Sequence, residues 1–191
     1  MLRNCNCALV AIGGNLAGHM DSPYAQVNAA IDQISQAGLH VSRRSRLYLT
    51  PCFPKGAGPD FVNAAVACVT TRAPSEVLAL LHEVEQAAGR SRHKRWEARV
   101  IDLDLLAYDD RVLPDLAGYR AWESLPVDQQ MICTPGEVIL PHPRLQERAF
   151  VIVPLNDVAP DWRHPVSGLT VAEMYAALPQ HEIDEIRPIS Q

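Results

Sequence analysis

The clearest signal of the fold lies in residues 7–38, CALVAIGGNLAGHMDSPYAQVNAAIDQISQAG. The apolar run Cys7–Ile12 ends at a Gly-Gly-Asn turn, which predicts a short buried strand. Asp-Ser-Pro at 21–23 then supplies a helix cap and a first-turn proline, and apolar residues recur at helical spacing from Tyr24 until Gly38. The stretch therefore predicts a strand, a turn and a helix.

The next segments predict more strands and one more helix. Apolar or small side chains alternate over 39–49 and predict a second strand, and the β-branched and small residues of 61–71 predict a third. Pro74 opens a helix with one apolar face that ends at Gly89, and residues 100–108 predict a fourth strand. Strands that follow one another directly, with two amphipathic helices between them, indicate an α+β fold with a largely antiparallel sheet.

The chain beyond residue 108 is less regular. Asp109-Asp110 predicts a turn that starts a hairpin, and residues 114–136 lack periodicity. We interpret 114–136 as an insertion with about one helical turn, within a single domain that spans residues 1–191. Three short elements are predicted after it: a strand at 138–140, a helix at 144–149, and a helix that begins at the capping box of Thr170 and Glu173.

Composition excludes several classes of protein. The 191 residues include 17 Lys+Arg and 22 Asp+Glu, for a formal net charge of −5, and 48% of the residues are hydrophobic. These values exclude disordered and coiled-coil chains, and a net acidic chain has no bulk attraction for nucleic acid. The apolar run at 7–12 is too short for a signal peptide or a membrane span. Five scattered cysteines without metal-binding spacing predict reduced thiols in a cytoplasmic protein.

An acidic pair lies inside the fourth predicted strand. Side chains alternate across a strand, so Asp102 and Asp104 share one face and Leu103 lies on the other. The two carboxylates repel each other by roughly 3 kcal/mol at an effective dielectric constant of about 20, unless water or a cation relieves them. Mg²⁺ is commonly held by one or two carboxylates together with substrate phosphates. The pair is therefore either a solvated strand face or a magnesium site.

A basic segment immediately precedes this strand. Residues 89–99 contain one acid, Glu97, and five cations: Arg90, Arg92, Lys94, Arg95 and Arg99. Guanidinium groups bind phosphate oxygens through two parallel hydrogen bonds, and lysine acts as a point charge. By itself the segment is compatible with a solvated loop. Beside two carboxylates it favours phosphoryl transfer, which needs positive charge on the phosphate oxygens.

Two smaller motifs carry aromatic and basic side chains. Pro141-His142-Pro143 is followed by Arg148 and Phe150, which is compatible with a phosphate site or with a capped helix and ordinary surface charge. Phe61 and Asn63 share a strand face, where an aromatic plane and an amide can hold a flat heterocycle, although an aromatic at a strand start also suits a core. The chain has no P-loop and no dinucleotide-binding fingerprint.

Two alternative functions remain open at this point. A nucleotide- or nucleic-acid-binding module would use the basic segment on a phosphate backbone, but it leaves Asp102 and Asp104 unexplained. A magnesium-dependent phosphohydrolase would use the same acids and arginines.

Taken in order, these motifs resemble the 6-hydroxymethyl-7,8-dihydropterin pyrophosphokinase family of folate biosynthesis. The resemblance extends from about residue 8 to about residue 162, and its most specific part combines Arg99-x-x-Asp102-Leu-Asp104 with Pro141-His-Pro-Arg-x-x-x-Arg148-x-Phe150. It implies a ferredoxin-like α/β/α sandwich. It also implies transfer of the β,γ-diphosphate of ATP to the pterin hydroxymethyl oxygen, which gives AMP and the pterin diphosphate. ATP is then a co-substrate with two Mg²⁺ ions, and no nucleic acid, membrane or obligate protein partner is expected.

The resemblance also implies roles for individual residues. The metal ligands would be Asp102 and Asp104. The catalytic residues would be Arg90, Arg92, Trp96, Arg99 and Arg148. The pterin contacts would be Thr50, Pro51, Phe53, Phe61, Asn63 and Phe150. The ATP contacts would be Leu78, His82, Glu85, Arg90, Arg92, Leu105, His142 and Arg148.

The chain departs from the family pattern in three places. Gly14 stands where the family usually has Ser, and Glu97 stands where Gly usually follows the Trp of a closing loop. Residues 114–136 are longer than the corresponding connection in compact members. Glu97 adds a charge and restricts the backbone, so it bears directly on how that loop closes.

Overall fold

The sheet is built around β1 (Asn6–Gly14), which pairs in antiparallel fashion with β4 (Phe61–Thr70) and β5 (Asp102–Tyr108). Its strand order is β5-β1-β4-β3-β6, with β3 (Tyr48–Thr50) beside β4, and β2 (His40–Arg44) also pairs with β4. The first, third and fourth predicted strands are thus confirmed. The computed structural model describes residues 5–52, 56, 58–89, 100–126, 129, 133 and 135–190.

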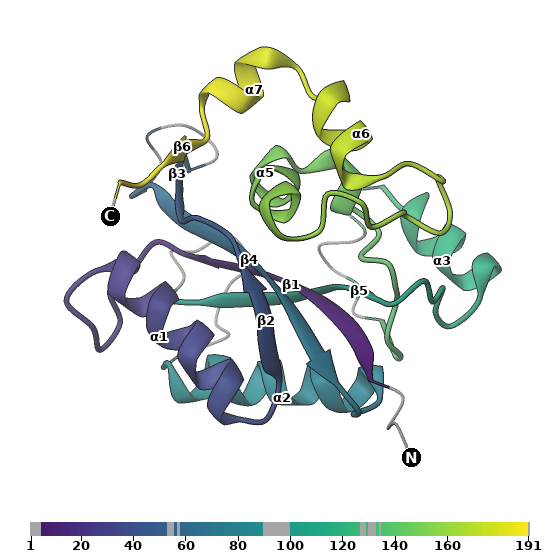
Figure 1. Ribbon diagram of the computed structural model, residues 1–191, viewed down its shortest axis with the longest axis horizontal. Coiled ribbons are helices and arrows are strands. Elements are labelled where there is room, and N and C mark those ends of the chain that lie inside the picture. The colour runs from purple at the N-terminus through teal and green to yellow at the C-terminus, as the bar shows by residue number, and fades with distance from the viewer. Residues whose placement is uncertain are drawn as a thin grey trace.

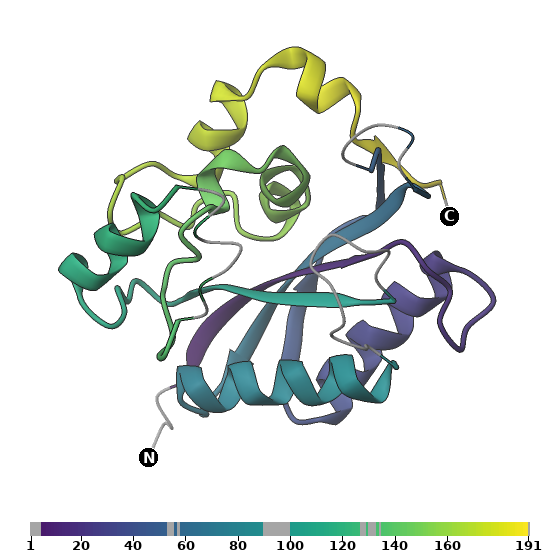
Figure 2. The same cartoon turned by 180° about the vertical axis from the view of Figure 1, so that it is seen from behind.

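Two amphipathic helices, α1 (Pro23–Gln36) and α2 (Pro74–Ala87), cover one face of the sheet, as predicted (Figures 1 and 2). The Ser22 hydroxyl caps α1 by accepting a hydrogen bond of 3.1 Å from the Ala25 amide. Gly38 follows α1 with a φ of +98°, a conformation that favours glycine. The apolar faces of both helices pack on the side chains that β1, β4 and β5 direct toward them.

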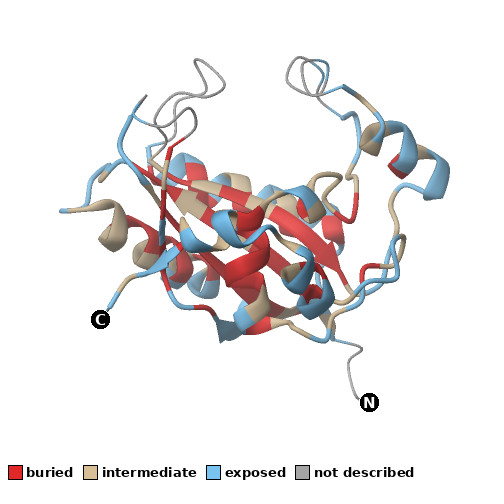
Figure 3. Cartoon of the chain, turned by 90° about the horizontal axis from the view of Figure 1, so that it is seen from above, coloured by how far each residue is buried: buried red, intermediate tan, exposed pale blue. Residues whose placement is uncertain are grey.

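The opposite face of the sheet is covered by α5 (Ala149–Val158), so the fold has three layers. The sequence pattern does not predict this helix, because it is apolar on nearly every side and contains Pro154. Such a helix is largely buried, and its residues Ala149, Val151–Leu155 and Val158 are buried here. Figure 3 shows the burial of the chain from above. The ferredoxin-like α/β/α sandwich is confirmed.

The prediction of one strand over residues 39–49 is wrong, because the structure has two strands, β2 and β3. Between Arg44 and Tyr48 the chain uses one residue more than β4 does opposite it. The amide of Arg46 donates to the Asp157 carboxylate on α5 at 3.2 Å instead of pairing with β4. This contact with α5 interrupts the ladder.

The segment that follows β5 also differs from the prediction. After the turn at Asp109, Leu113 exchanges two backbone hydrogen bonds of 2.8 and 3.1 Å with Leu140. The chain therefore pairs with Leu140 and not with β5, and no hairpin with β5 forms in the described residues. This isolated bridge replaces the strand predicted at 138–140. Between its two sides, α3 (Leu116–Glu123) has eight residues, or about two turns rather than one.

The remaining elements are short. The helix predicted at 144–149 is the 3₁₀ turn η1 (Leu145–Glu147), and the last predicted helix is α6 (Val171–Ala177) with the expected capping box. They are followed by α7 (Gln180–Asp184) and β6 (Arg187–Pro188), which pairs with β3. Within the described ranges, no helix combines the length and the apolar character that a membrane crossing requires.

Candidate active site

Two carboxylates lie on the α5 face of the sheet. Leu103 and Leu105 are buried in the core beneath α1 and α2, so strand alternation directs Asp102 and Asp104 to the other face, where both are partly exposed. The predicted placement of the acidic pair on one face is therefore confirmed. Leu105, an expected ATP contact, has its side chain 5% exposed in the core, which leaves only its backbone for such a contact.

Gly13 keeps the middle of this face open. By register it lies opposite Asp102 on β5 and opposite Asn63 on β4, so the three residues form a row across the sheet. A Cβ atom on Gly13 would lie 2.6 Å from Asn63 Oδ1, and the amide could not keep its place. Sequence reasoning took this glycine only as part of a turn, although a glycine at a strand end also signals a close approach.

Asn63 connects this row to the residues expected to hold the pterin. Its Nδ2 donates a hydrogen bond of 2.6 Å to Thr50 Oγ1, and Thr50 lies opposite Phe61 in the β3–β4 ladder. Asn63 and Thr50 are buried, whereas Phe61 and Pro51 are partly exposed. The fold therefore brings an aromatic ring, an amide and a hydroxyl together beside the acidic pair.

Arg148 stands between the acidic pair and a second aromatic ring. Its Nη1 atom lies 3.7 Å from Asp104 Oδ2, and its guanidinium lies 5.8 Å from the ring centre of Phe150, which is 42% exposed at the start of α5. A partly exposed ion pair of this length contributes about 1 kcal/mol at most. The attraction to Asp104 therefore offers little resistance when Arg148 binds a ligand phosphate.

His142 is a neutral hydrogen-bond donor in the same region. Its backbone amide donates to Leu106 O on β5 at 2.8 Å, and its Nδ1 accepts from the Arg144 amide at 3.2 Å. Desolvation by the surrounding protein, followed by the charge of Arg148, lowers the pKa of His142 to about 3, against the opposing effect of Asp102. The ring is therefore neutral near pH 7 with its proton on Nε2.

The expected ATP-binding stripe of α2 reaches the edge of β5. Leu78 and His82 are partly exposed, and Glu85 is 1% exposed. Glu85 Oε1 accepts a hydrogen bond of 2.8 Å from the Leu103 amide, which lies between the two aspartates along the strand. The stripe and the acidic pair are thus joined through β5, although they lie on different sides of it.

The basic segment can be described only at its ends. Five expected site residues lie outside the described residues: Phe53, Arg90, Arg92, Trp96 and Arg99. At one end, Gly89 follows α2 with a φ of +88°. At the other end, the Val100 carbonyl oxygen lies 2.5 Å from where a Cβ atom on Gly14 would stand. The serine that the family usually has at position 14 would therefore require Val100 to move.

Sequence reasoning missed a polar cluster that fastens α5 to β3. Asp157 on α5 accepts hydrogen bonds from the Tyr48 hydroxyl at 2.8 Å and from Arg46 Nη2 and Nε at 2.8 and 3.1 Å. Burial acts to raise the pKa of Asp157, but these hydrogen bonds prevail and hold it below its ordinary value. Tyr48 lies opposite Asn63, so the cluster borders the residues that are expected to contact the pterin. No local spacing links residues so far apart in the chain.

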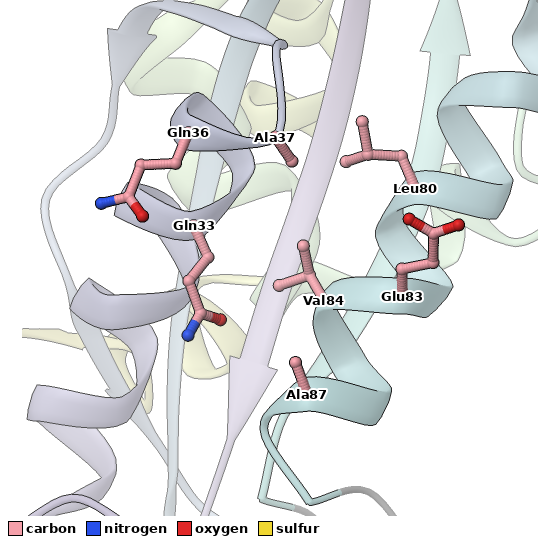
Figure 4. A pocket seen from close by; sticks show the side chains of 7 residues that line it. All are labelled: Gln33, Gln36, Ala37, Leu80, Glu83, Val84 and Ala87. Carbon is pink, nitrogen blue, oxygen red and sulfur yellow. The ribbon is translucent and has the colours of Figure 1, made fainter.

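A hollow of about 360 Å³ lies between α1 and α2, on the other side of the sheet (Figure 4). Its lining consists of Gln33, Gln36, Ala37, Leu80, Glu83, Val84 and Ala87. These side chains include no cation and only one carboxylate, so the hollow has neither the charge nor the aromatic surface of the site around Arg148.

The acidic pair suits a metal that a ligand helps to hold. Among the described residues, no group of three or more His, Cys, Asp or Glu side chains is placed to bind a metal ion. Mg²⁺ needs only one or two carboxylates when substrate phosphates and water complete its shell. Asp102 and Asp104 fit that pattern.

The fold and this face of the sheet define an enzyme that transfers a phosphate-bearing group: carboxylates suited to Mg²⁺, an arginine, and aromatic rings beside an amide. The sequence pattern of the 7,8-dihydro-6-hydroxymethylpterin-pyrophosphokinase (HPPK) family matches residues 9–160 of the chain. The chain belongs to this family. It is a pyrophosphokinase that acts on hydroxymethyldihydropterin in folate biosynthesis.

Individual relatives agree with this assignment. The chain is 33% identical to the 2-amino-4-hydroxy-6-hydroxymethyldihydropteridine pyrophosphokinase of Synechocystis over 90% of this chain and 76% of the relative. The enzyme of that name in Pseudomonas aeruginosa is 33% identical over 93% of this chain and 94% of the relative. A solved Plasmodium falciparum HPPK-DHPS chain matches with a TM-score of 0.65 at 16% identity, over 96% of this chain and 47% of the solved one, which supports the fold.

Proposed function

We propose that the α5 face of the sheet binds MgATP beside 6-hydroxymethyl-7,8-dihydropterin and transfers the β,γ-diphosphate to the hydroxymethyl oxygen, with release of AMP. The observation that carries this proposal is the position of Arg148 between Asp104 and the Phe150 ring. A cation at this point lies between carboxylates suited to a metal-bound triphosphate and an aromatic ring suited to a pterin.

In this proposal the two substrates contact different sets of residues. The pterin stacks between Phe61 and Phe150, and its polar edge contacts Thr50, Pro51, Phe53 and Asn63. The ATP contacts are Leu78, His82, Glu85, Arg90, Arg92, Leu105, His142 and Arg148. The direct hydrogen bond between Asn63 and Thr50 supports this assignment, because it fixes both side chains in place before a flat ring binds.

In this proposal Asp102 and Asp104 hold two Mg²⁺ ions. Bound Mg²⁺ neutralises the triphosphate oxygens and stabilises the charge that develops on them during transfer. His142 donates from Nε2, and Arg90, Arg92, Arg99 and Arg148 hold the diphosphate in line with the hydroxymethyl oxygen, while Trp96 helps to exclude water. No strong base is required, because the rate comes from positioning and charge stabilisation.

Product analysis tests the reaction. The protein is incubated with ATP and Mg²⁺, with and without the pterin, and the nucleotides are separated. AMP that forms only with the pterin supports the proposal, whereas ADP with free phosphate indicates a phosphohydrolase. ATP affinity that is independent of Mg²⁺ indicates a plain binding module.

A pair of arginine variants tests the role of Arg148. Arg148→Ala should lower kcat by roughly 10²–10³-fold, the cost of removing one donor from developing charge. Arg163→Ala is the matched control, because Arg163 is exposed and pairs with Glu173, away from the acidic pair. Equal kcat values for both variants would contradict the proposed site.

The setting of the enzyme is also part of the proposal. We place it in the cytoplasm as a single domain with an insertion at 114–136, acting on small molecules without nucleic acid, membrane or an obligate protein partner. No disulfide joins its five cysteines in the part of the chain that the structure describes, which suits a reducing compartment.

A further inference from the structure

The segment 114–136 is flanked by a backbone bridge between Leu113 and Leu140. Leu113 and Leu140 close its base through two backbone hydrogen bonds of 2.8 and 3.1 Å. Just inside this base, the Asp115 carboxylate caps α3 by accepting from the Gly118 amide at 2.8 Å. The described part of the segment therefore has a fixed start, and α3 projects from it with a defined direction.

Tyr119 anchors α3 to the C-terminal part of the chain. It is fully buried, and its hydroxyl lies 3.4 Å from Nε2 of His164, whose ring also packs edge-on against Trp162. His164 Nδ1 accepts from the backbone amides of Val166 and Ser167 at 3.2 Å each. Nδ1 therefore carries no proton, and the neutral ring directs its Nε2 proton to Tyr119.

Glu123, at the last position of α3, connects this anchor to η1. Its Oε1 accepts two hydrogen bonds, from the Tyr119 hydroxyl at 3.2 Å and from Gln146 Nε2 at 2.9 Å. Gln146 lies in the middle of η1, two residues before Arg148. A hydrogen bond to a carboxylate is stronger than one between neutral groups. The end of α3 is thus fastened to the turn that carries Arg148.

The 3₁₀ turn has little strength of its own. Its two internal backbone hydrogen bonds, Glu147 N to Arg144 O and Arg148 N to Leu145 O, are long at 3.3 and 3.4 Å. Short 3₁₀ helices have poor hydrogen-bond geometry, so external contacts decide where such a turn sits. The contact between Gln146 and Glu123 is one of these, and it comes from outside the sheet.

We propose that α3 is a brace for the transferring arginine: Glu123, oriented by Tyr119, holds Gln146 and through it sets the position of Arg148 relative to Asp104. Glu123 and Gln146 are positioning residues that touch neither substrate. This gives a catalytic purpose to a segment that is longer here than in compact members of the family. The inference rests on the proposed role of Arg148 in transfer.

Three variants test the brace. Glu123→Ala and Gln146→Ala should each lower kcat about tenfold, less than the roughly hundredfold cost of a 1 Å misplacement, with KM for the pterin nearly unchanged. Glu123→Gln keeps an oxygen that accepts from both partners and should retain kcat within about twofold. Ser124→Ala is the matched control, because this neighbouring exposed hydroxyl bonds, among the residues that the structure describes, only to Ala121 O of its own helix. Circular dichroism and melting temperature establish that each variant is folded.

A double-mutant cycle separates positioning from general loosening of the fold. If Gln146 acts through Arg148, Gln146→Ala should lower kcat in the parent enzyme and have almost no effect in the Arg148→Ala background. The same factor in both backgrounds, or an unchanged kcat in folded Gln146→Ala, would overturn the brace. If Arg148→Ala alone leaves kcat unchanged, the proposed role of Arg148 fails first. Should Glu123→Ala not fold, Gln146→Ala decides the matter, because Gln146 is partly exposed and its truncation leaves Glu123 bonded to Tyr119.

Discussion

The row formed by Asp102, Gly13 and Asn63 and the turn formed by residues 142–148 belong to the same candidate site but are held in different ways. The row lies on three adjacent strands, so the sheet register fixes its members relative to one another. The turn has one backbone hydrogen bond to the sheet, from His142 to Leu106, and its Leu145 is buried in the core beside α5. Its polar side chains contact α3 and β5. Substitutions in the row should therefore affect the substituted residue and its direct neighbour in the row, whereas substitutions around the turn should move Arg148 relative to the row.

The largest effect is expected from the acidic end of the row. Asp102→Ala should lower turnover by at least roughly 10²–10³-fold, because it removes a proposed metal ligand and its charge from the proposed phosphate site. The variant should stay folded, because the Asp102 carboxylate is partly exposed and is repelled by that of Asp104 without metal. Pterin-dependent AMP formation and thermal unfolding measure the two effects. Asp110→Ala, in the exposed turn after β5, is the control, and unfolding of Asp102→Ala alone would show that the acid is structural.

A smaller effect is expected at the centre of the row. Gly13→Ala places a methyl group 2.6 Å from Asn63 Oδ1, so the amide must move from the position that is proposed to contact the pterin. We expect kcat/KM for the pterin to fall about tenfold, with 1–3 kcal/mol of lost stability from overpacking. Affinity for ATP should change little. Gly136→Ala, where an added methyl group meets nothing within 4 Å, is the control. A Gly13→Ala enzyme with unchanged pterin kinetics would show that Asn63 does not read the substrate.

The same contrast explains what the sequence could predict. Period-two alternation places Asp102 and Asp104 on one face, and helix caps bound α1 and α2, because these signals act over a few residues. The faces on which Asp102 and Asn63 lie were therefore accessible. Their alignment in one row through Gly13 was not, because it depends on the order of the strands and on a neighbour of Gly13 that lies 50 residues away in sequence.

The parts around α5 and the turn could not be predicted in this way. The helix α5 has no polar face and contains Pro154, so its pattern does not differ from that of a buried strand. The contacts that position it, such as Asp157 with Tyr48 and Gln146 with Glu123, join residues far apart in the chain. The family resemblance predicted which residues on this side belong to the site. The structure shows the contacts that hold α5 and the turn in place.

A modest effect is expected where α5 meets β3. Tyr48→Phe removes one hydrogen bond to Asp157 but leaves both Arg46 contacts, so the free energy of unfolding should fall by about 1–2 kcal/mol. KM for the pterin should rise less than threefold, because Asn63 stays in its ladder. Urea unfolding and steady-state kinetics measure both. Tyr175→Phe is the control, since its hydroxyl makes no hydrogen bond within the described residues. A stability loss shared equally by both variants would contradict an anchoring role for Tyr48.

The smallest effect is a pH dependence on the side of the brace. His164 is 1% exposed, and burial lowers its pKa against the opposing charge of Glu123. In the unfolded chain a histidine takes up a proton near pH 6.5, so below that pH the unfolded state binds a proton that the folded state does not. The stability that His164 contributes is therefore complete above about pH 6.5 and is lost as the pH falls toward its lowered folded pKa.

Urea unfolding between pH 7.5 and pH 5.5 tests this pH dependence. His164→Gln keeps a hydrogen-bonding side chain but cannot titrate, so its free energy of unfolding should fall less steeply below pH 6.5, by at most about 1.4 kcal/mol per pH unit. His142 contributes in the same direction in both proteins, because its pKa is also lowered, so the difference between the two curves isolates His164. Parallel curves would mean that His164 is not held neutral. A shallower curve for His164→Gln would show that part of the acid sensitivity of the fold comes from the contacts that hold α3. These contacts support the turn and not the row on the strands.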